Sequence, residues 1–135
     1  MIHVIMGLKG SGKTKKLIDS VNATAATASG VVVCIEYGNK LTYDVKSTVR
    51  LVNSKEYGIS SGSMLKGFLS GLHAGNYDIT HVYIDNLYKT IGNDRAAGEE
   101  FILWCAEFAK ANDMEITVTV SDDAALASDA VRAYL

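Results

Sequence analysis

The amino-acid sequence predicts an α/β fold, a three-layer sandwich built around a mostly parallel five-stranded sheet. Short apolar, β-branched runs alternate with longer segments whose apolar residues recur at helical spacing. Some of these runs are continuously apolar, as in parallel strands that are covered on both faces. The 135 residues contain no linker, repeat or low-complexity stretch, so residues 1–135 are expected to form one domain.

The amino-terminal half of the chain is expected to contain three strands and one long helix. A short apolar run makes 2–6 a buried strand, and helical spacing of apolar residues follows over 13–28. Gly30 is a natural stop for that helix. The β-branched run 31–36 is typical of a parallel strand, whereas the shorter 49–52 is expected at the edge of the sheet.

The carboxyl-terminal half is expected to add three helices and two strands. Large apolar residues at helical spacing predict helices over 61–74 and 97–112. Strands are expected at 79–85 and 115–120, and a last helix at 123–134. Because crossovers between parallel strands are right-handed, the carboxyl ends of all strands should meet at one edge, where ligands bind.

A glycine-rich loop links the first predicted strand to the first predicted helix. Its residues are Gly7, Leu8, Lys9, Gly10, Ser11, Gly12, Lys13 and Thr14. The pattern G-x-x-x-x-G-K-[ST] between a strand and a helix predicts a nucleoside-triphosphate site, in which backbone N–H groups surround phosphate oxygens. Lys13 can reach the β- and γ-phosphates, and the Thr14 hydroxyl can bind Mg²⁺. The alternative is an exposed glycine turn, which would not require these flanking elements.

Asp85 ends the strand at 79–85 and is the second predicted Mg²⁺ ligand. Mg²⁺ prefers oxygen ligands and keeps several waters, so a carboxylate near Thr14 suits it, directly or through water. A strand-end aspartate can also be no more than a cap of the next loop or helix. Its coincidence with the glycine loop favours the metal role.

Other polar residues at strand ends are candidates for catalysis. Glu36 is a candidate general base, with an exposed strand-end glutamate as the alternative. Ser121, or Asp122 after it, is a candidate sensor of the γ-phosphate, with an N-cap of the last helix as the alternative. Arg95 is a candidate arginine finger, acting within the chain or on a neighbouring subunit, rather than a solvated loop arginine.

These motifs resemble those of P-loop NTPases, and the order of elements is similar to that of the RecA-like branch. Within that branch the chain resembles the nucleotide-binding core of thymidine kinases. The matching pieces are Gly7–Thr14, Val31–Glu36, Ile84–Asp85, Ala109–Asn112 and Ile116–Ser121. The resemblance implies the P-loop NTPase fold, with the last strand between the strand of the glycine loop and the strand of Asp85.

The chain departs from that family pattern in two ways. Asn86 stands where many such enzymes carry the glutamate that serves as general base, and an amide cannot accept a proton at neutral pH. The zinc-binding cysteines and the long nucleoside-binding segment of thymidine kinases are also missing. Thymidine kinase activity is therefore not expected.

Three functions are compatible with these residues. The leading hypothesis is a Mg²⁺-dependent ATP-binding protein that is a slow or partner-stimulated ATPase. The first alternative is a nucleotide-dependent switch or assembly module without useful turnover, acting through a protein partner or a homo-oligomer. The second is a small-molecule or nucleoside phosphotransferase, with 37–47 and 53–61 as its candidate acceptor loops. ATP is favoured over GTP because no N-K-x-D motif is present.

Composition limits the partners and the compartment. The formal net charge of −2 gives no overall attraction to nucleic acid or anionic membranes, and no clear nucleic-acid patch is visible. Cys34 and Cys105 lie in separate apolar stretches and are expected to be buried thiols. No apolar run approaches the ~18 residues of a membrane span. The first strand begins without a signal peptide, so we expect a cytoplasmic protein.

Overall fold

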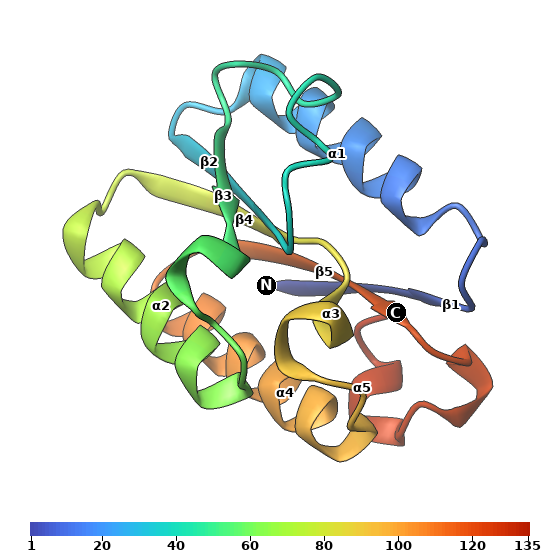
Figure 1. Cartoon of the computed structure of the whole chain (residues 1–135). Helices are drawn as coiled ribbons and strands as arrows, with labels where there is room; N and C mark the ends of the chain where they lie inside the picture. The colour runs from blue at the N-terminus through green and yellow to red at the C-terminus, as the bar shows by residue number, and fades with distance from the viewer.

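The computed structural model describes residues 1–135 as a five-stranded, wholly parallel sheet with helices on both faces (Figure 1). The α/β class and the three-layer arrangement are confirmed. The elements are, in chain order, β1 (Ile2–Gly7), α1 (Lys13–Thr27), β2 (Val31–Glu36), β3 (Arg50–Asn53), the 3₁₀-helix η1 (Ser54–Tyr57), α2 (Gly62–Gly75), β4 (Ile79–Ile84), α3 (Leu87–Ile91), α4 (Arg95–Ala111), β5 (Glu115–Ser121), the 3₁₀-helix η2 (Ala124–Leu126) and α5 (Asp129–Arg132).

The strand order across the sheet is β1-β5-β4-β2-β3. The last strand therefore lies between β1 and β4, as expected, and β3 is the expected edge strand. All four neighbouring pairs are parallel, so every strand ends at the same edge of the sheet. This edge holds the glycine loop after β1, Asp85 after β4 and Glu36 at the end of β2.

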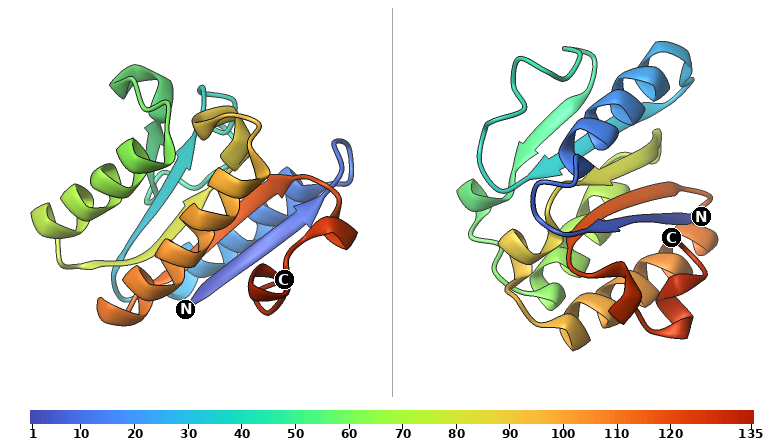
Figure 2. Two further views of the ribbon diagram at one scale, coloured as in Figure 1. Left: turned by 90° about the horizontal axis from the view of Figure 1, so that it is seen from below. Right: turned by 90° about the vertical axis from the view of Figure 1, so that its right-hand side faces the viewer.

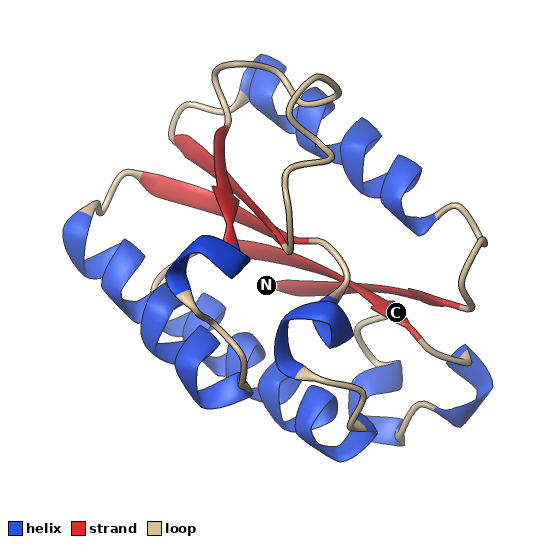
Figure 3. Cartoon of the chain, in the orientation of Figure 1, coloured by secondary structure: helices blue, strands red, loops and turns tan.

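The two faces of the sheet are covered unequally (Figure 3). The helices α2 to α5 cover one face, where 23 buried side chains form the larger core around Phe101, Leu65 and Ile84. The helix α1 and the loop after β2 cover the other face, where the core has 8 buried side chains, including Leu17 and Tyr83. Tyr83 is held there by a hydrogen bond between its hydroxyl and that of Thr24, at 2.7 Å.

The prediction of one continuous helix over 123–134 is wrong. The segment forms η2 and the short α5, which are separated by extended backbone at Ala127 and Ser128. The side chains of Asp123 and Ser128 each accept a hydrogen bond from a backbone N–H two or three residues later, and so each begins its own short turn. The carboxyl-terminal segment then lies beside β1 (Figure 2), where the Val4 N–H donates to the carbonyl of Tyr134 at 2.9 Å.

None of the helices combines the length and the apolar character that crossing a membrane requires. Both cysteines are buried free thiols, as expected. Burial, followed by the nearby charges of Asp85 and Glu36, raises the pKa of Cys34 to about 12, so this thiol is neutral at physiological pH.

Candidate functional site

The glycine loop between β1 and α1 needs glycine at two positions and is tightly packed at a third. Gly10 and Gly12 have φ of +84° and +86°, in the left-handed region where a side chain is strained. A Cβ atom at Gly7 would lie 2.6 Å from the Ser11 hydroxyl oxygen. The Ser11 N–H donates to the carbonyl of Leu8 at 3.1 Å and closes the turn. The glycines of the motif therefore allow the backbone to adopt this tight turn.

The loop is open to solvent and leads directly into the amino-terminal end of α1. Gly12 is the N-cap residue of this helix, and no side chain accepts a hydrogen bond from its first turn. The N-terminal N–H groups and the helix dipole favour an anion at such a position. Leu8 and Lys9 are exposed on the outside of the loop. The backbone is thus arranged for an anionic ligand without competition from a capping side chain.

Lys13 is buried even though the loop around it is exposed. Only 9% of its surface is accessible, and its ammonium group donates to the carbonyl oxygen of Leu8 at 3.0 Å. A second, longer contact of 3.5 Å joins the Lys13 Nζ atom to the hydroxyl oxygen of Ser11. The positive charge is therefore held against the loop rather than extended into solvent.

Thr14 and Asp85 meet at the head of α1, although 71 residues separate them. The Thr14 hydroxyl oxygen lies 3.4 and 3.5 Å from the two carboxylate oxygens of Asp85. The Asp85 N–H donates to the carbonyl of Ile35 on β2 at 2.8 Å, which anchors its backbone. The parallel register of β4 between β5 and β2 carries Asp85 to this position.

Thr119 supports Asp85 from the neighbouring strand β5, a role that the sequence analysis missed. Its hydroxyl donates to Asp85 Oδ1 at 2.9 Å and accepts the Asn86 N–H at 2.6 Å. Thr119 is only 1% exposed, so water does not compete for these bonds. The implied strand order, with the last strand beside that of Asp85, was the signal that could have identified it.

The Thr14 hydroxyl and the Asp85 carboxylate form a donor set that fits Mg²⁺. Both offer hard oxygen atoms, and Mg²⁺ in proteins often takes only one or two such ligands, completing its shell with phosphate oxygens and water. No group of three or more His, Cys, Asp or Glu side chains is arranged to hold a metal ion. Thr14 and Asp85 are therefore the residues that would hold such an ion.

Glu36 is buried, so the interpretation as an exposed strand-end glutamate is wrong. It is 4% exposed, and its two carboxylate oxygens accept the N–H groups of Lys40 at 3.0 Å and Leu41 at 2.9 Å. These bonds fix the start of the loop after β2. Glu36 also lines a cavity of about 130 Å³ together with Thr14 and Asp85. It is therefore near the predicted metal ligands, but both of its oxygens already have partners.

Ser121 and Asp122 end β5 next to the glycine loop. Ser121 is half-buried and pairs in register with Gly7, whose carbonyl accepts the Asp122 N–H at 3.1 Å. Neither residue is an N-cap, so that alternative is wrong. Arg95 donates to both carboxylate oxygens of Asp122 at 2.8 Å, and the Tyr88 hydroxyl donates to one of them at 2.8 Å.

This cluster shifts the pKa values of its members. The hydrogen bonds from the Arg95 guanidinium are the largest influence on Asp122, and they hold the pKa of its carboxyl well below its usual range. Burial and the hydrogen bond to Asp122 raise the pKa of Tyr88 to about 12. Arg95 is the first residue of α4 rather than a loop residue, and its side chain is exposed to solvent while it pairs with Asp122. The cluster joins α3 and α4 to the edge that carries the glycine loop.

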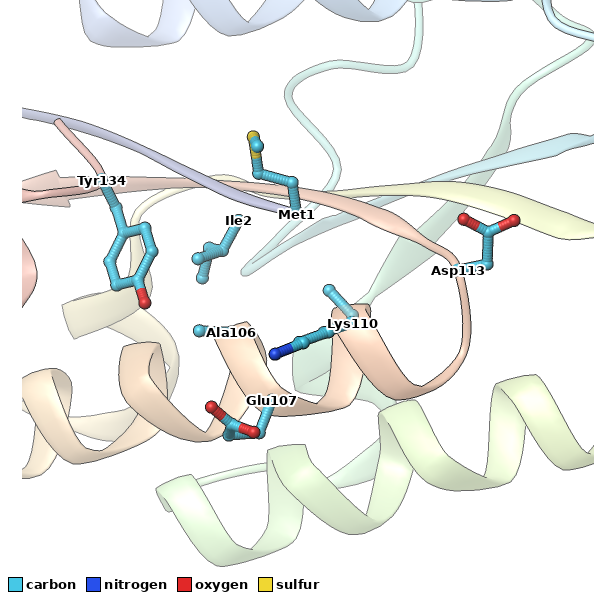
Figure 4. A pocket seen from close by; sticks show the side chains of 8 residues that line it. Met1, Ile2, Ala106, Glu107, Lys110, Asp113 and Tyr134 are labelled. Atoms are coloured by element: carbon cyan, nitrogen blue, oxygen red, sulfur yellow. The ribbon is translucent and has the colours of Figure 1, made fainter.

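A separate cavity of about 410 Å³ lies at the other end of β1, where Met1 and Ile2 face Ala106, Lys110 and Tyr134 (Figure 4). Its charged side chains form no ion pair within the protein. It shares no residue with the glycine loop, and none of the predicted site residues lines it. The predicted residues instead gather at the carboxyl edge of the sheet.

Comparison with protein-family models gives no match, and comparison with curated proteins gives none either.

Proposed function

We propose that this chain is a Mg²⁺-dependent ATP-binding protein of the P-loop NTPase superfamily, in its RecA-like branch, and a slow or partner-stimulated ATPase. The observation that carries the proposal is the meeting of Thr14 and Asp85, at 3.4 Å, behind a glycine loop that opens at the head of α1. An incidental surface turn would have no reason to align with a carboxylate from another strand of the sheet. The position of β5 between β1 and β4 supports the assignment to the RecA-like branch.

The residues of the loop divide the binding of a triphosphate among them. The backbone N–H groups of Gly10 to Gly12 and the start of α1 would receive phosphate oxygens. The Lys13 ammonium would exchange the Leu8 carbonyl for the β- and γ-phosphates. Thr14 and Asp85 would hold Mg²⁺, which when bound with the nucleotide neutralises charge on the phosphates.

We expect ATP hydrolysis to be slow because the site lacks a free group that could activate water. Asn86 carries an amide at the position after Asp85, and Glu36 already accepts two backbone N–H groups. The carboxylate of Asp122 is occupied by Arg95 and Tyr88. None of these groups is a free general base. This observation also favours the second candidate function, a nucleotide-dependent switch or assembly module without useful turnover.

The test compares wild type with Lys13→Ala and Lys16→Ala. Lys16 lies on α1 three residues later, is exposed and has no carboxylate partner, so it controls for the loss of a positive charge near the loop. We expect Mg-ATP to raise the melting temperature of wild type and of Lys16→Ala. The affinity of Lys13→Ala should fall about 10- to 100-fold, because a charge-assisted bond worth about 1.5–3 kcal/mol is lost.

Calorimetry with ATP, GTP and ADP, with and without Mg²⁺, gives the affinities and the base preference. Phosphate release above the Lys13→Ala background would identify an ATPase, whereas tight binding without release, with a change of oligomeric state, would identify a switch. The proposal fails if Mg-ATP has no effect on wild type, or if Lys13→Ala and Lys16→Ala bind it equally.

A further inference from the structure

A groove runs along the carboxyl edge of the sheet, away from the Thr14–Asp85 pair. The cavity of about 130 Å³ beside this pair shares Tyr37 and Lys89 with a second cavity of about 330 Å³, which extends to Lys55 and Ser60. We call the two together the edge groove. Its walls come from α3, η1 and the start of the loop after β2.

The first cavity of the edge groove is lined by both acidic and basic side chains, whereas the second is lined by lysines without a carboxylate. Asp85 and Glu36 lie at the end that contains Thr14. Lys40 lines the same cavity, Lys89 lines both cavities and Lys55 lines the second, and none of their ammonium groups lies within 4.0 Å of a carboxylate oxygen. The second cavity therefore has two lysines and no carboxylate among its lining residues, in a protein whose net charge is −2. It favours an anion at the Lys55–Lys89 end.

An exposed aromatic ring lies between the two ends. Tyr37 lines both cavities and is 40% exposed. The Lys55 ammonium lies 5.9 Å from the centre of this ring, a cation–π distance that positions the lysine beside the tyrosine. A flat ligand ring can stack on such a side chain while its charged group reaches the lysine.

We propose that the edge groove binds a phosphomonoester that carries an aromatic ring, with its phosphate at Lys55 and Lys89 and its ring against Tyr37. The phosphate lies in the cavity that holds Lys55 and Lys89, because no carboxylate lines that cavity, and the uncharged end of the ligand faces Thr14 and Asp85. The inference rests on the proposed function in one respect, that ATP phosphates and Mg²⁺ occupy the Thr14 end. Its ligand is either a free small molecule or the 5′-phosphorylated end of a single nucleic-acid strand.

The test is calorimetry on the full chain saturated with Mg²⁺ and a non-hydrolysable ATP analogue, so that added phosphate esters cannot enter the glycine loop. Phenyl phosphate is the probe, with inorganic phosphate and phenol as partial ligands. We expect phenyl phosphate to bind more tightly than either, and more weakly as salt is raised. Lys89→Gln should weaken it about tenfold, as expected for one charge-assisted contact. Tyr37→Leu should reduce its affinity to that of inorganic phosphate.

Lys110→Gln is the matched control, since Lys110 is an exposed lysine on α4 that likewise has no carboxylate partner and lines the cavity at the other end of β1. It should bind phenyl phosphate as wild type does. The proposal is overturned if wild type does not bind phenyl phosphate, or if Lys110→Gln weakens binding as much as Lys89→Gln. Either result leaves the proposed function standing as long as the ATP analogue binds.

Two further arms separate the remaining outcomes. In one outcome, phenyl phosphate binding depends on Lys89 and persists in Lys13→Ala, while no variant binds the ATP analogue. That outcome would support ligand binding in the edge groove and overturn the proposed function. The second arm uses oligothymidine with a 5′-phosphate. If it binds more tightly than phenyl phosphate, and more tightly than the same strand without its phosphate, the ligand is a strand end. Equal or weaker binding of that strand would identify a free small molecule.

Discussion

Replacing Thr119 by valine removes the hydroxyl that holds Asp85 while it keeps the shape of a buried side chain. The hydroxyl donates to Asp85 Oδ1 at 2.9 Å and accepts the Asn86 N–H at 2.6 Å, in a place that water does not reach. Valine therefore leaves the carboxylate without its support from β5 and the N–H group without an acceptor. If Asp85 binds Mg²⁺, both stability and nucleotide affinity depend on this one oxygen atom.

The size of the effect follows from these two bonds. A hydrogen bond to a charged group contributes about 1.5–3 kcal/mol, and a buried N–H left without a partner costs about 1–3 kcal/mol. The added methyl group of valine offsets about 1 kcal/mol through apolar burial. We therefore expect Thr119→Val to lower the free energy of unfolding by about 1.5–5 kcal/mol. For a chain of this size that is roughly a 5–25 °C fall in melting temperature.

Urea unfolding measures the stability, and calorimetry with and without Mg²⁺ measures the ATP affinity. A side chain that orients a metal ligand changes metal affinity about 10- to 100-fold, so the Mg²⁺-dependent part of ATP binding should weaken by that amount. Thr117→Val is the control, because Thr117 lies on the same face of β5 and its hydroxyl makes no hydrogen bond in the protein. Thr117→Val loses no hydrogen bond and buries one more methyl group, so its stability should not fall and should rise by at most about 1 kcal/mol. Equal effects of the two substitutions would refute the role given to Thr119.

Two further predictions concern stability. Gly30→Ala should cost about 1–3 kcal/mol in urea unfolding, because its Cβ would lie 2.6 Å from the carbonyl oxygen of Asp78. Gly67→Ala, on α2, meets no atom within 4 Å, so a loss as large as that of Gly30→Ala would contradict this. The low pKa of Asp122 beside Arg95 means that their pair stabilises the fold above the ordinary aspartate pKa, and that this contribution fades as the pH falls below about 4. The gap in melting temperature between wild type and Asp122→Asn should narrow on acidification, and a gap independent of pH would contradict the assignment.

Periodicity predicted most elements of the fold because their environments agree with their local preferences. The run 31–36 is β-branched and becomes the strand β2, buried from Val32 onwards. The stripe through Phe101 and Cys105 becomes the buried face of α4. The prediction of one helix in the carboxyl-terminal segment was wrong because the Asp123 and Ser128 side chains cap two separate turns. A helical pattern of apolar residues does not reveal these caps.

The candidate site was predicted unevenly for a similar reason. The loop from Gly7 to Thr14 is local, since its glycines and its position before a helix are visible in eight consecutive residues. The support from Thr119 and the binding of Arg95 by Asp122 are not local, because each joins residues far apart in the chain. The burial of Glu36 also depends on a loop that folds back over it.

The sequence by itself determined the alternation of strands and helices and the residue pattern of the glycine loop, because both depend on residue types at short spacing. The sequence also predicted that Asp85 lies near Thr14, whereas only the tertiary structure decided which other polar groups hold them there. Parallel pairing of β4 with β5 and β2 brings Asp85 to Thr14 and Thr119, and it leaves the edge groove open between Tyr37 and Lys89. The physical reason is that strand order and register result from the packing of both cores at once, and no short segment contains that information.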